Sequence, residues 1–333
     1  MTQRIELPLT DPGYSTYHFQ GPSLAVTSAN PSIRNWTLSN IMILSCERRF
    51  LRGYTSPDIK VVDSWWNKNP YLEKYWYSMR FTKGHTNCMI REMLEEGFYV
   101  PFSGIDDYYV SGKSWYRERH FSHDGMVCGF DRADKTFCIY AYDSHWIYRK
   151  FWTPWEDFNR GRRSILKQGG SGSICAIRPK FDKVLFSAQT ACSKIGEYLN
   201  SDLEKYPPDQ DGTAYGIIVH DYISMYVGKL FDGSIPYERM DRRVFRQIWE
   251  HKKLMLERLA LIEQELELDT ECSSRYAPLV ALADGMRMLY ASHHMRRRDS
   301  VLPILQKKLE ALKRDEEEIL NTLIGKTKGK FES

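Results

Sequence analysis

The sequence predicts an α+β domain followed by an all-helical domain, with the change between them near residue 180. Before that point, short apolar or alternating runs such as 136–142 are typical of β-strands. After it, apolar residues recur every three or four positions over long segments such as 241–268, which is the period of an α-helix. A chain of 333 residues is long enough for two domains. We therefore expect an extended N-terminal arm at 1–35, the α+β domain at 36–180 and the helical domain at 181–325.

The first two expected segments differ in composition. The arm is rich in proline, glycine, serine and threonine, which favour irregular backbone. In the α+β domain, the aromatic-rich stretch 65–77 is expected to form a wall of the core. The expected strands cover 40–45, 58–62, 123–130, 136–142 and 174–177, and the expected helices begin near Met89 and Thr153. Thr153 is a strong helix start, because Pro154 follows it at the first helical position and Glu156 lies three residues after it.

The helical domain is expected to contain five helices, each with one apolar face that needs a partner. In the longest of them Phe245, Ile248 and Leu259 lie on one side. The five expected helices cover 183–203, 215–230, 241–268, 275–295 and 301–323. Such a set is typical of a small helix bundle.

Charge and hydropathy restrict the partners. The formal net charge is +4, and no segment forms a dense stripe of lysine and arginine, so we expect no nucleic-acid partner. No run approaches about 18 consecutive apolar residues, and the N-terminus lacks the pattern of a signal peptide. We therefore expect no membrane association. The small basic excess suits an acidic carrier protein as a partner.

The cysteine pattern indicates free thiols. The chain has seven cysteines, an odd number, and no two of them form a C-x-x-C pair. This argues against a disulfide framework and against a zinc knuckle. No histidine pair has the H-x-x-x-H spacing of a metal site. We therefore expect a cytoplasmic protein without a metal or another bound cofactor.

The stretch 84–143 contains an ordered set of residues that suits nucleophilic catalysis. Cys88 stands at the start of an amphipathic segment, where the positive end of a helix dipole favours a thiolate. His123 begins one expected strand, and Asp143 ends the next. A cysteine, a histidine and an acid in this order predict a nucleophile, a general base and a residue that orients the base. Cys88, His123 and Asp143 are thus the predicted catalytic residues.

Other residues compete for these roles. His120 precedes the same strand as His123, and Asp124 or Asp131 could replace Asp143. Asn87 and His85 stand beside Cys88 and are the predicted oxyanion or substrate contacts. Cys88 itself could be a buried structural residue, the commonest fate of a free cysteine.

These motifs resemble those of papain-like cysteine proteins, and most closely the butirosin biosynthesis protein H family. The points of likeness are the Cys88 segment, His123 placed six residues before Gly129-Phe130, Asp143, and the 151–158 segment. The resemblance implies a papain-like α+β fold. It also implies acyl transfer from the phosphopantetheine thioester of an acyl or peptidyl carrier protein to a small amine or peptide acceptor, within natural-product biosynthesis. No cofactor of its own is implied.

One position departs from the papain-like pattern. Papain-like proteases carry a glutamine six residues before the nucleophile as an oxyanion donor, and here that position is Thr82. The departure weakens the case for peptide hydrolysis more than the case for transfer from an activated thioester. A cysteine hydrolase with the same three residues is the second hypothesis. A non-catalytic binding protein of the same fold is the third.

Overall fold

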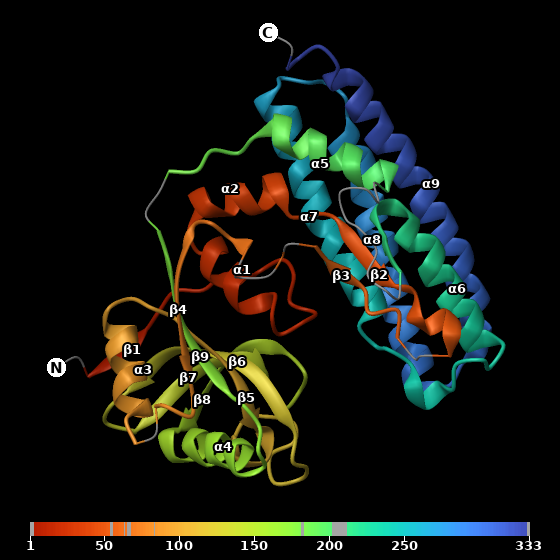
Figure 1. Ribbon diagram of the computed structural model, residues 1–333. Coiled ribbons are helices and arrows are strands. Elements are labelled where there is room, and N and C mark those ends of the chain that lie inside the picture. Colours follow the sequence, from red (N-terminus) through yellow and green to blue (C-terminus); the bar gives the residue numbers. More distant parts are fainter. Residues whose placement is uncertain are drawn as a thin grey trace. The chain divides into compact units, whose positions relative to one another are not determined.

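The computed structural model describes residues 3–53, 56–62, 64, 68–82, 84–180, 183–201 and 212–331. The chain forms two compact units, whose elements are labelled in Figure 1. The first unit comprises Met1–Arg34 and Trp65–Lys183, and the second comprises Asn35–Ser64 and Val184–Ser333. The structure contains both helices and a sheet and has a helical C-terminal region. The predicted combination of an α and β region with a helical C-terminal region is therefore confirmed. The unit boundaries differ from the predicted domains, because 35–64 join the helical unit.

The first unit is built on a seven-stranded antiparallel sheet. Its strand order is β4-β9-β5-β6-β7-β8, and β1 pairs with the last residues of β6. The strands are β1 (Arg4–Glu6), β4 (Leu72–Ser78), β5 (Val100–Asp106), β6 (Ser122–Asp131), β7 (Thr136–Tyr142), β8 (Tyr148–Pro154) and β9 (Ser173–Pro179). The helices are α1 (Gly21–Ser28), α2 (Pro31–Asn40), which runs across the boundary between the units, α3 (Thr86–Glu95), the 3-10 turn η3 (Asp107–Tyr109) and α4 (Trp155–Lys167).

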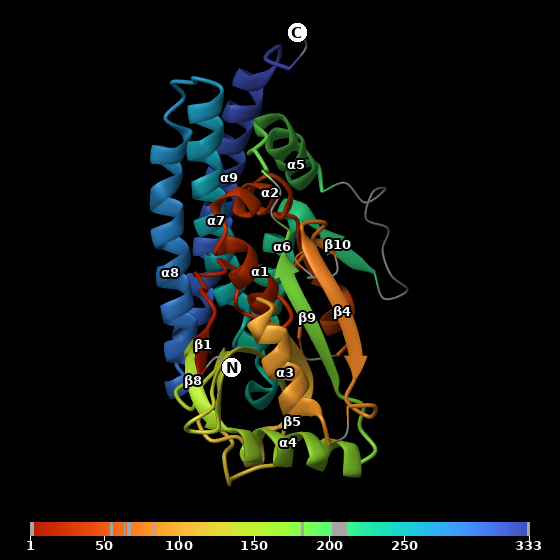
Figure 2. The same ribbon diagram turned by 90° about the vertical axis from the view of Figure 1, so that its left-hand side faces the viewer.

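Alternating residues of the central strands form two separate cores. In β6, Met126 packs in one core with Ala25 of α1, whereas Val127 packs in the other core with Ile90 of α3 and Phe158 of α4. Successive side chains of a strand point to opposite faces of the sheet. Helix α1 therefore covers one face, and α3 and α4 cover the other (Figures 1 and 2).

Several expected elements differ from those in the structure. The arm is not an extended segment, because it contains α1, whose eight residues are all buried. The strand expected at 40–45 begins instead at Leu44, because α2 continues to Asn40. In the aromatic stretch, residues 65–67 lie outside the described residues. In β4 the side chain of Trp76 is 53% exposed, and those of Tyr75 and Tyr77 are exposed as well. That stretch is therefore not a core wall. The strands at 136–142 and around 123–130 are confirmed.

The second unit consists of five long helices and a small sheet. The helices are α5 (Ala188–Asn200), α6 (Val219–Phe231), α7 (Val244–Glu265), α8 (Cys272–Arg296) and α9 (Leu302–Thr327). The small sheet has the strand order β10-β2-β3, and its strands are β2 (Leu44–Glu47), β3 (Lys60–Val61) and β10 (Thr213–Tyr215). The short 3-10 turns are η1 (Arg48–Arg52), η4 (Gly216–Ile218), η5 (Tyr237–Arg239) and η6 (Asp299–Val301). All five helices overlap the predicted ones. Among the described residues, none of the helices combines the length and the apolar character needed to cross a membrane.

A buried charged pair lies at the centre of the second unit. Lys252 of α7 donates to both carboxylate oxygens of Glu316 of α9, at 2.7 and 2.6 Å, and both side chains are fully buried. The hydroxyl groups of Tyr198 and Tyr276 also donate to Glu316, at 3.1 and 2.5 Å. These hydrogen bonds compensate for the loss of hydration, without which a buried charge is strongly destabilising.

Next to this pair, His220 gives the helical unit a predicted sensitivity to acid. Its Nε2 lies 3.6 Å from Glu316, and burial together with the Lys252 cation lowers the pKa of His220 to about 4. In the unfolded chain a histidine titrates near pH 6.5, so the unfolded state binds this proton first as the pH falls. The contribution of neutral His220 to the free energy of unfolding is therefore fully present above about pH 6.5. As the pH falls towards 4, about 3 kcal/mol of this free energy is lost.

Urea unfolding followed by helicity, at several values between pH 7.5 and 4.5, measures this effect. Burial also lowers the pKa of His251, which therefore acts in the same direction over this range. The pKa of Glu316 is lowered from 4.5, so its contribution is lost only at lower pH. A His220→Gln variant should therefore keep part of the pH dependence and show a shallower slope between pH 6.5 and 4.5. The same slope in the variant and the wild type would contradict the assignment to His220.

Candidate functional site

The structure places Cys88 on the exposed side of α3. Cys88 is the third residue of this helix, so the prediction of a helix start at this point is confirmed. The buried side of α3 carries Thr86, Ile90 and Leu94, and Cys88 lies two residues from Ile90, which turns it away from the core. Its thiol donates to Glu92 Oε1 at 3.2 Å. Within the part of the chain that the structure describes, no hydrogen bond links Cys88 to His123.

His123 instead pairs with an aspartate that directly follows the neighbouring strand β5. Its Nδ1 lies 2.5 Å from Oδ2 of Asp107, whose side chain is almost completely buried. Asp107 follows β5, which is antiparallel to β6 and places Asp106 opposite Ser122. The backbone N–H of Asp107 also donates to the carbonyl of Phe121 at 2.8 Å. The sheet register thus places this carboxylate beside the imidazole.

Asp143, which the sequence predicted as the partner of His123, has a different role. It accepts hydrogen bonds from the backbone N–H groups of His145 and Ile147, at 2.8 and 2.9 Å, and from the Arg149 guanidinium. These bonds hold the turn between β7 and β8. Asp107, rather than Asp143, is therefore the residue that can orient His123.

The other candidates from the sequence also have structural partners. Asn87 accepts a hydrogen bond from Asn159 of α4 at 2.9 Å, and His85 is exposed at the N-cap of α3. His120 pairs with Asp106 at 2.8 Å, and its side chain is 55% exposed. Asp131 accepts from two backbone N–H groups in the turn after β6. These contacts bring none of them to His123.

Two residues that the sequence analysis did not select lie close to the His123–Asp107 pair. The ring of His18, from the segment before α1, has its centroid 4.6 Å from that of His123. The ammonium group of Lys113 lies 3.7 Å from Oδ1 of Asp107, and its side chain is buried. Burial lowers the pKa of Lys113, while the Asp107 and Asp124 carboxylates oppose this effect. The Asp107 carboxylate thus lies between a histidine and a lysine.

A cavity of about 260 Å³ lies next to His18, which is the one described member of this group in its wall. It lies on the α1 face of the sheet, and its wall contains His18, Phe19, Pro22, Trp76, Pro101, Phe102, Ser103, Asp124, Gly125 and Ser173. The cavity is thus largely apolar, with two titratable side chains and two hydroxyl groups. This composition is typical of a pocket for a small organic ligand.

Burial disfavours the charged forms of the two titratable residues of the cavity. Burial lowers the pKa of His18 well below its usual value, and the nearby Lys113 and His123 lower it further. Burial raises the pKa of Asp124, although the Gly104 N–H donates to it at 3.3 Å. A neutral imidazole can accept a proton, and a carboxyl group with a raised pKa can donate one. Titratable groups shifted in this way are typical of functional sites.

The arrangement suits general acid–base chemistry better than attack by a cysteine. Asp107 holds Nδ1 of His123 and favours the tautomer whose Nε2 can accept a proton. None of the described residues that line the cavity is a cysteine. The described residues also contain no group of three histidine, cysteine or acidic side chains that could hold a metal ion.

Sequence reasoning missed Asp107 and His18 for identifiable reasons. Asp107 belongs to an Asp-Asp pair at the end of a strand directly before the histidine strand, a position that an antiparallel pairing brings next to His123. The sequence of 98–118 reads as loop and strand between the Cys88 helix and the His123 strand, and nothing in it singles out this pair. His18 lies in a segment whose composition predicted an irregular arm.

No protein-family model matches the chain, and a search of curated proteins finds no match.

Proposed function

We propose that the first unit catalyses transfer of an acyl group from a thioester to an amine, with His123 as the general base. The observation that carries the proposal is the hydrogen bond between His123 and buried Asp107, next to a cavity lined by His18 and Asp124. A histidine whose Nδ1 is held by a carboxylate can act as a general base through its Nε2. The papain-like fold for this unit is part of the same proposal.

The reaction needs no covalent enzyme intermediate. His123 Nε2 removes a proton from the attacking amine as its nitrogen forms a bond to the thioester carbonyl carbon. The C–S bond then breaks, and the leaving thiolate takes up a proton from the Asp124 carboxyl group. The products are an amide and a thiol, and Asp124 regains its proton from the His123 imidazolium or from solvent. With water in place of the amine, the same groups would hydrolyse the thioester.

The resemblance described above is the basis for the substrate class, a thioester carried on phosphopantetheine by an acyl or peptidyl carrier protein. A cytoplasmic location belongs to the same proposal. It would keep reduced the thiols of Cys128 and Cys138, which lie 3.6 Å apart in the core of the sheet. Natural-product biosynthesis is the setting that the resemblance suggests.

A non-catalytic binding protein is the second candidate. The outward position of Cys88 favours it over a cysteine mechanism, because the predicted nucleophile does not contact the predicted base. In that case the cavity would hold an acyl group or a small amine without turning it over.

Comparing Cys88→Ala with His123→Ala tests the proposal, using a panel of acyl-pantetheine thioesters and amines and measuring free thiol and amide. We expect Cys88→Ala to match the wild type, because the thiol is exposed and paired with Glu92. His123→Ala should lose about 10²–10⁴-fold in rate, the usual contribution of general acid–base catalysis. Loss of activity in Cys88→Ala would restore the cysteine mechanism. Binding of thioesters or amines by the wild type without turnover would favour the binding protein.

A further inference from the structure

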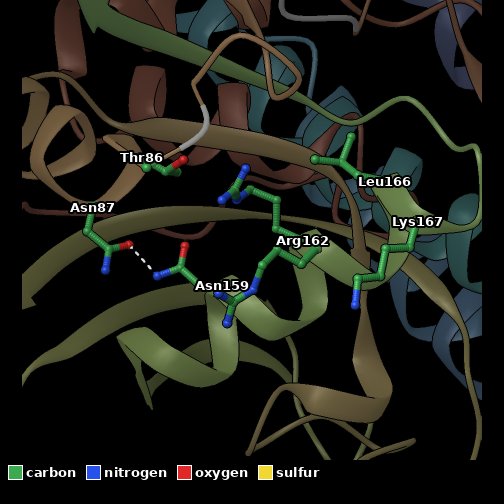
Figure 3. A pocket seen from close by; sticks show the side chains of 8 residues that line it. Thr86, Asn87, Asn159, Arg162, Leu166 and Lys167 are labelled. Atoms are coloured by element: carbon green, nitrogen blue, oxygen red, sulfur yellow. Dashed lines mark hydrogen bonds between the residues drawn. The ribbon is translucent and has the colours of Figure 1, made fainter.

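A second cavity of the first unit lies between the start of α3 and α4, on the sheet face opposite that of His18. Its volume is about 550 Å³. Thr86 and Asn87 line it from α3, and Asn159, Arg162, Arg163 and Lys167 line it from α4. Figure 3 shows the two groups of side chains facing each other, with the hydrogen bond between Asn87 and Asn159 on one side. Asn159, Arg163 and Lys167 are four positions apart and so share one face of α4, and Arg162 lies three positions after Asn159.

The electrostatics of this cavity favour an anion. Three cationic side chains line it, and none of its described lining residues is acidic. Within the described part of the chain, Arg163 and Lys167 form no ion pair, unlike Arg160, which pairs with Glu156 at 2.6 Å. The N-terminus of α3 adds to the positive potential, because its N-cap residue, His85, makes no side-chain capping bond. Free N–H groups and the helix dipole at such an end bind anions.

Arg162 provides an independent indication of a ligand. Its side chain is 5% exposed, and Nη1 donates to the Met79 carbonyl at 3.4 Å. Its Nε is a buried donor with no partner among the described residues. Burial lowers the pKa of Arg162, and the neighbouring Arg163 cation lowers it further. A buried guanidinium beside a second cation, without a carboxylate in the cavity, is costly unless an anion pairs with it.

We propose that this cavity binds the phosphate group of a small phosphate monoester. A doubly charged tetrahedral anion matches two guanidinium groups, one ammonium group and a helix N-terminus better than a single carboxylate does. The volume leaves space for part of the organic group. The site is independent of the proposed function, because it uses none of the residues of the His123 site.

Calorimetric titration of the full chain with inorganic phosphate, 4′-phosphopantetheine, adenosine monophosphate and unphosphorylated pantetheine tests this proposal. We expect the phosphorylated probes to bind and pantetheine to bind at least tenfold more weakly. Arg163→Gln and Lys167→Gln should each weaken phosphopantetheine binding about tenfold, as expected for the loss of one charge-assisted contact. Arg160→Gln is the matched control on the same helix and should change binding less than twofold. Because Arg163 and Lys167 form no ion pair within the described chain, both variants should fold normally.

The probes also distinguish the origin of the phosphate. Tighter binding of phosphopantetheine than of adenosine monophosphate supports a pantetheine ligand, and the reverse order supports a nucleotide. Binding of inorganic phosphate without either ester would show an adventitious ion only and would overturn the proposal. Equal weakening by Arg160→Gln would overturn it as well, because the effect would then come from general surface charge. The failure of this test would leave the His123 mechanism unaffected, since the two sites share no residue.

Discussion

Asp107→Asn is expected to reduce acyl transfer about 10²–10⁴-fold while leaving the protein folded. Asp107 holds Nδ1 of His123 at 2.5 Å, and an asparagine amide can instead donate to that nitrogen. The imidazole would then carry its proton on Nε2, and that nitrogen could no longer accept a proton from the amine. The decrease should appear in kcat more than in KM, because Asp107 acts through His123 rather than on the substrate. Steady-state rates, from which kcat and KM are obtained separately for the wild type and the variant, measure this effect.

Asp143→Asn is the matched control for this experiment. It removes a carboxylate that contacts Arg149 and the turn between β7 and β8 but makes no hydrogen bond to His123 among the described residues. We expect its rate to stay within about twofold of the wild type, since a change outside the reacting groups leaves transition-state binding intact. If Asp143→Asn lost the activity and Asp107→Asn kept it, the original sequence prediction would be correct and the His123–Asp107 assignment would be wrong.

The choice between these two aspartates shows what the sequence can predict about the site. Asp107 and Asp143 follow the two strands, β5 and β7, that flank the histidine strand β6. In an antiparallel sheet both ends lie at the same edge as the start of β6, so an acid near His123 was predictable. Which acid points at the ring depends on the turns. Asp143 accepts hydrogen bonds from backbone N–H groups of its own hairpin. The spacing of residues in the sequence does not reveal this local competition for the carboxylate.

The extent of the two units depended on contacts that a sequence pattern cannot reveal. Residues 36–64 follow the arm directly and contain two expected strands, at 40–45 and 58–62, so the sequence predicts them in the α+β domain. In the structure Arg258 of α7 donates to the carbonyls of Leu38 and Ile41, and His251 contacts the Met42 carbonyl at 2.8 Å. These long-range polar contacts hold the segment in the helical unit. The long helices, in contrast, follow from the repeat of apolar residues alone.

The helix in the N-terminal arm was missed because its composition favours irregular backbone. Gly21 and Pro22 begin α1, and the helix is buried on all sides rather than amphipathic. A short helix without a polar face has no helical period to detect. The consequence for the site is direct, since His18 lies in the segment that leads into this helix and lines the cavity.

Lys252→Met is expected to destabilise the helical unit by about 3–5 kcal/mol, the usual cost of leaving one partner of a buried ion pair without the other. Glu316 would keep the hydrogen bonds from Tyr198 and Tyr276 but would lose the only ammonium group that contacts it in the described chain. At neutral pH the unfolded chain would then hold this carboxylate in water, and the folded unit would hold it buried and uncompensated. The midpoint of urea unfolding, followed by helicity, measures the loss.

Two further variants separate the cost of an unpaired charge from the loss of a contact. In Lys252→Met with Glu316→Gln, the neutral amide oxygen can still accept from both tyrosines, so we expect most of the stability to return. Lys313→Met removes a lysine whose pair with Asp221, at 2.7 Å, is partly exposed, and it should cost at most about 1 kcal/mol. Equal losses in Lys252→Met and Lys313→Met would mean that burial adds nothing to the effect of Lys252. A double variant as unstable as Lys252→Met alone would mean that Lys252 stabilises the core by its packing rather than by its charge.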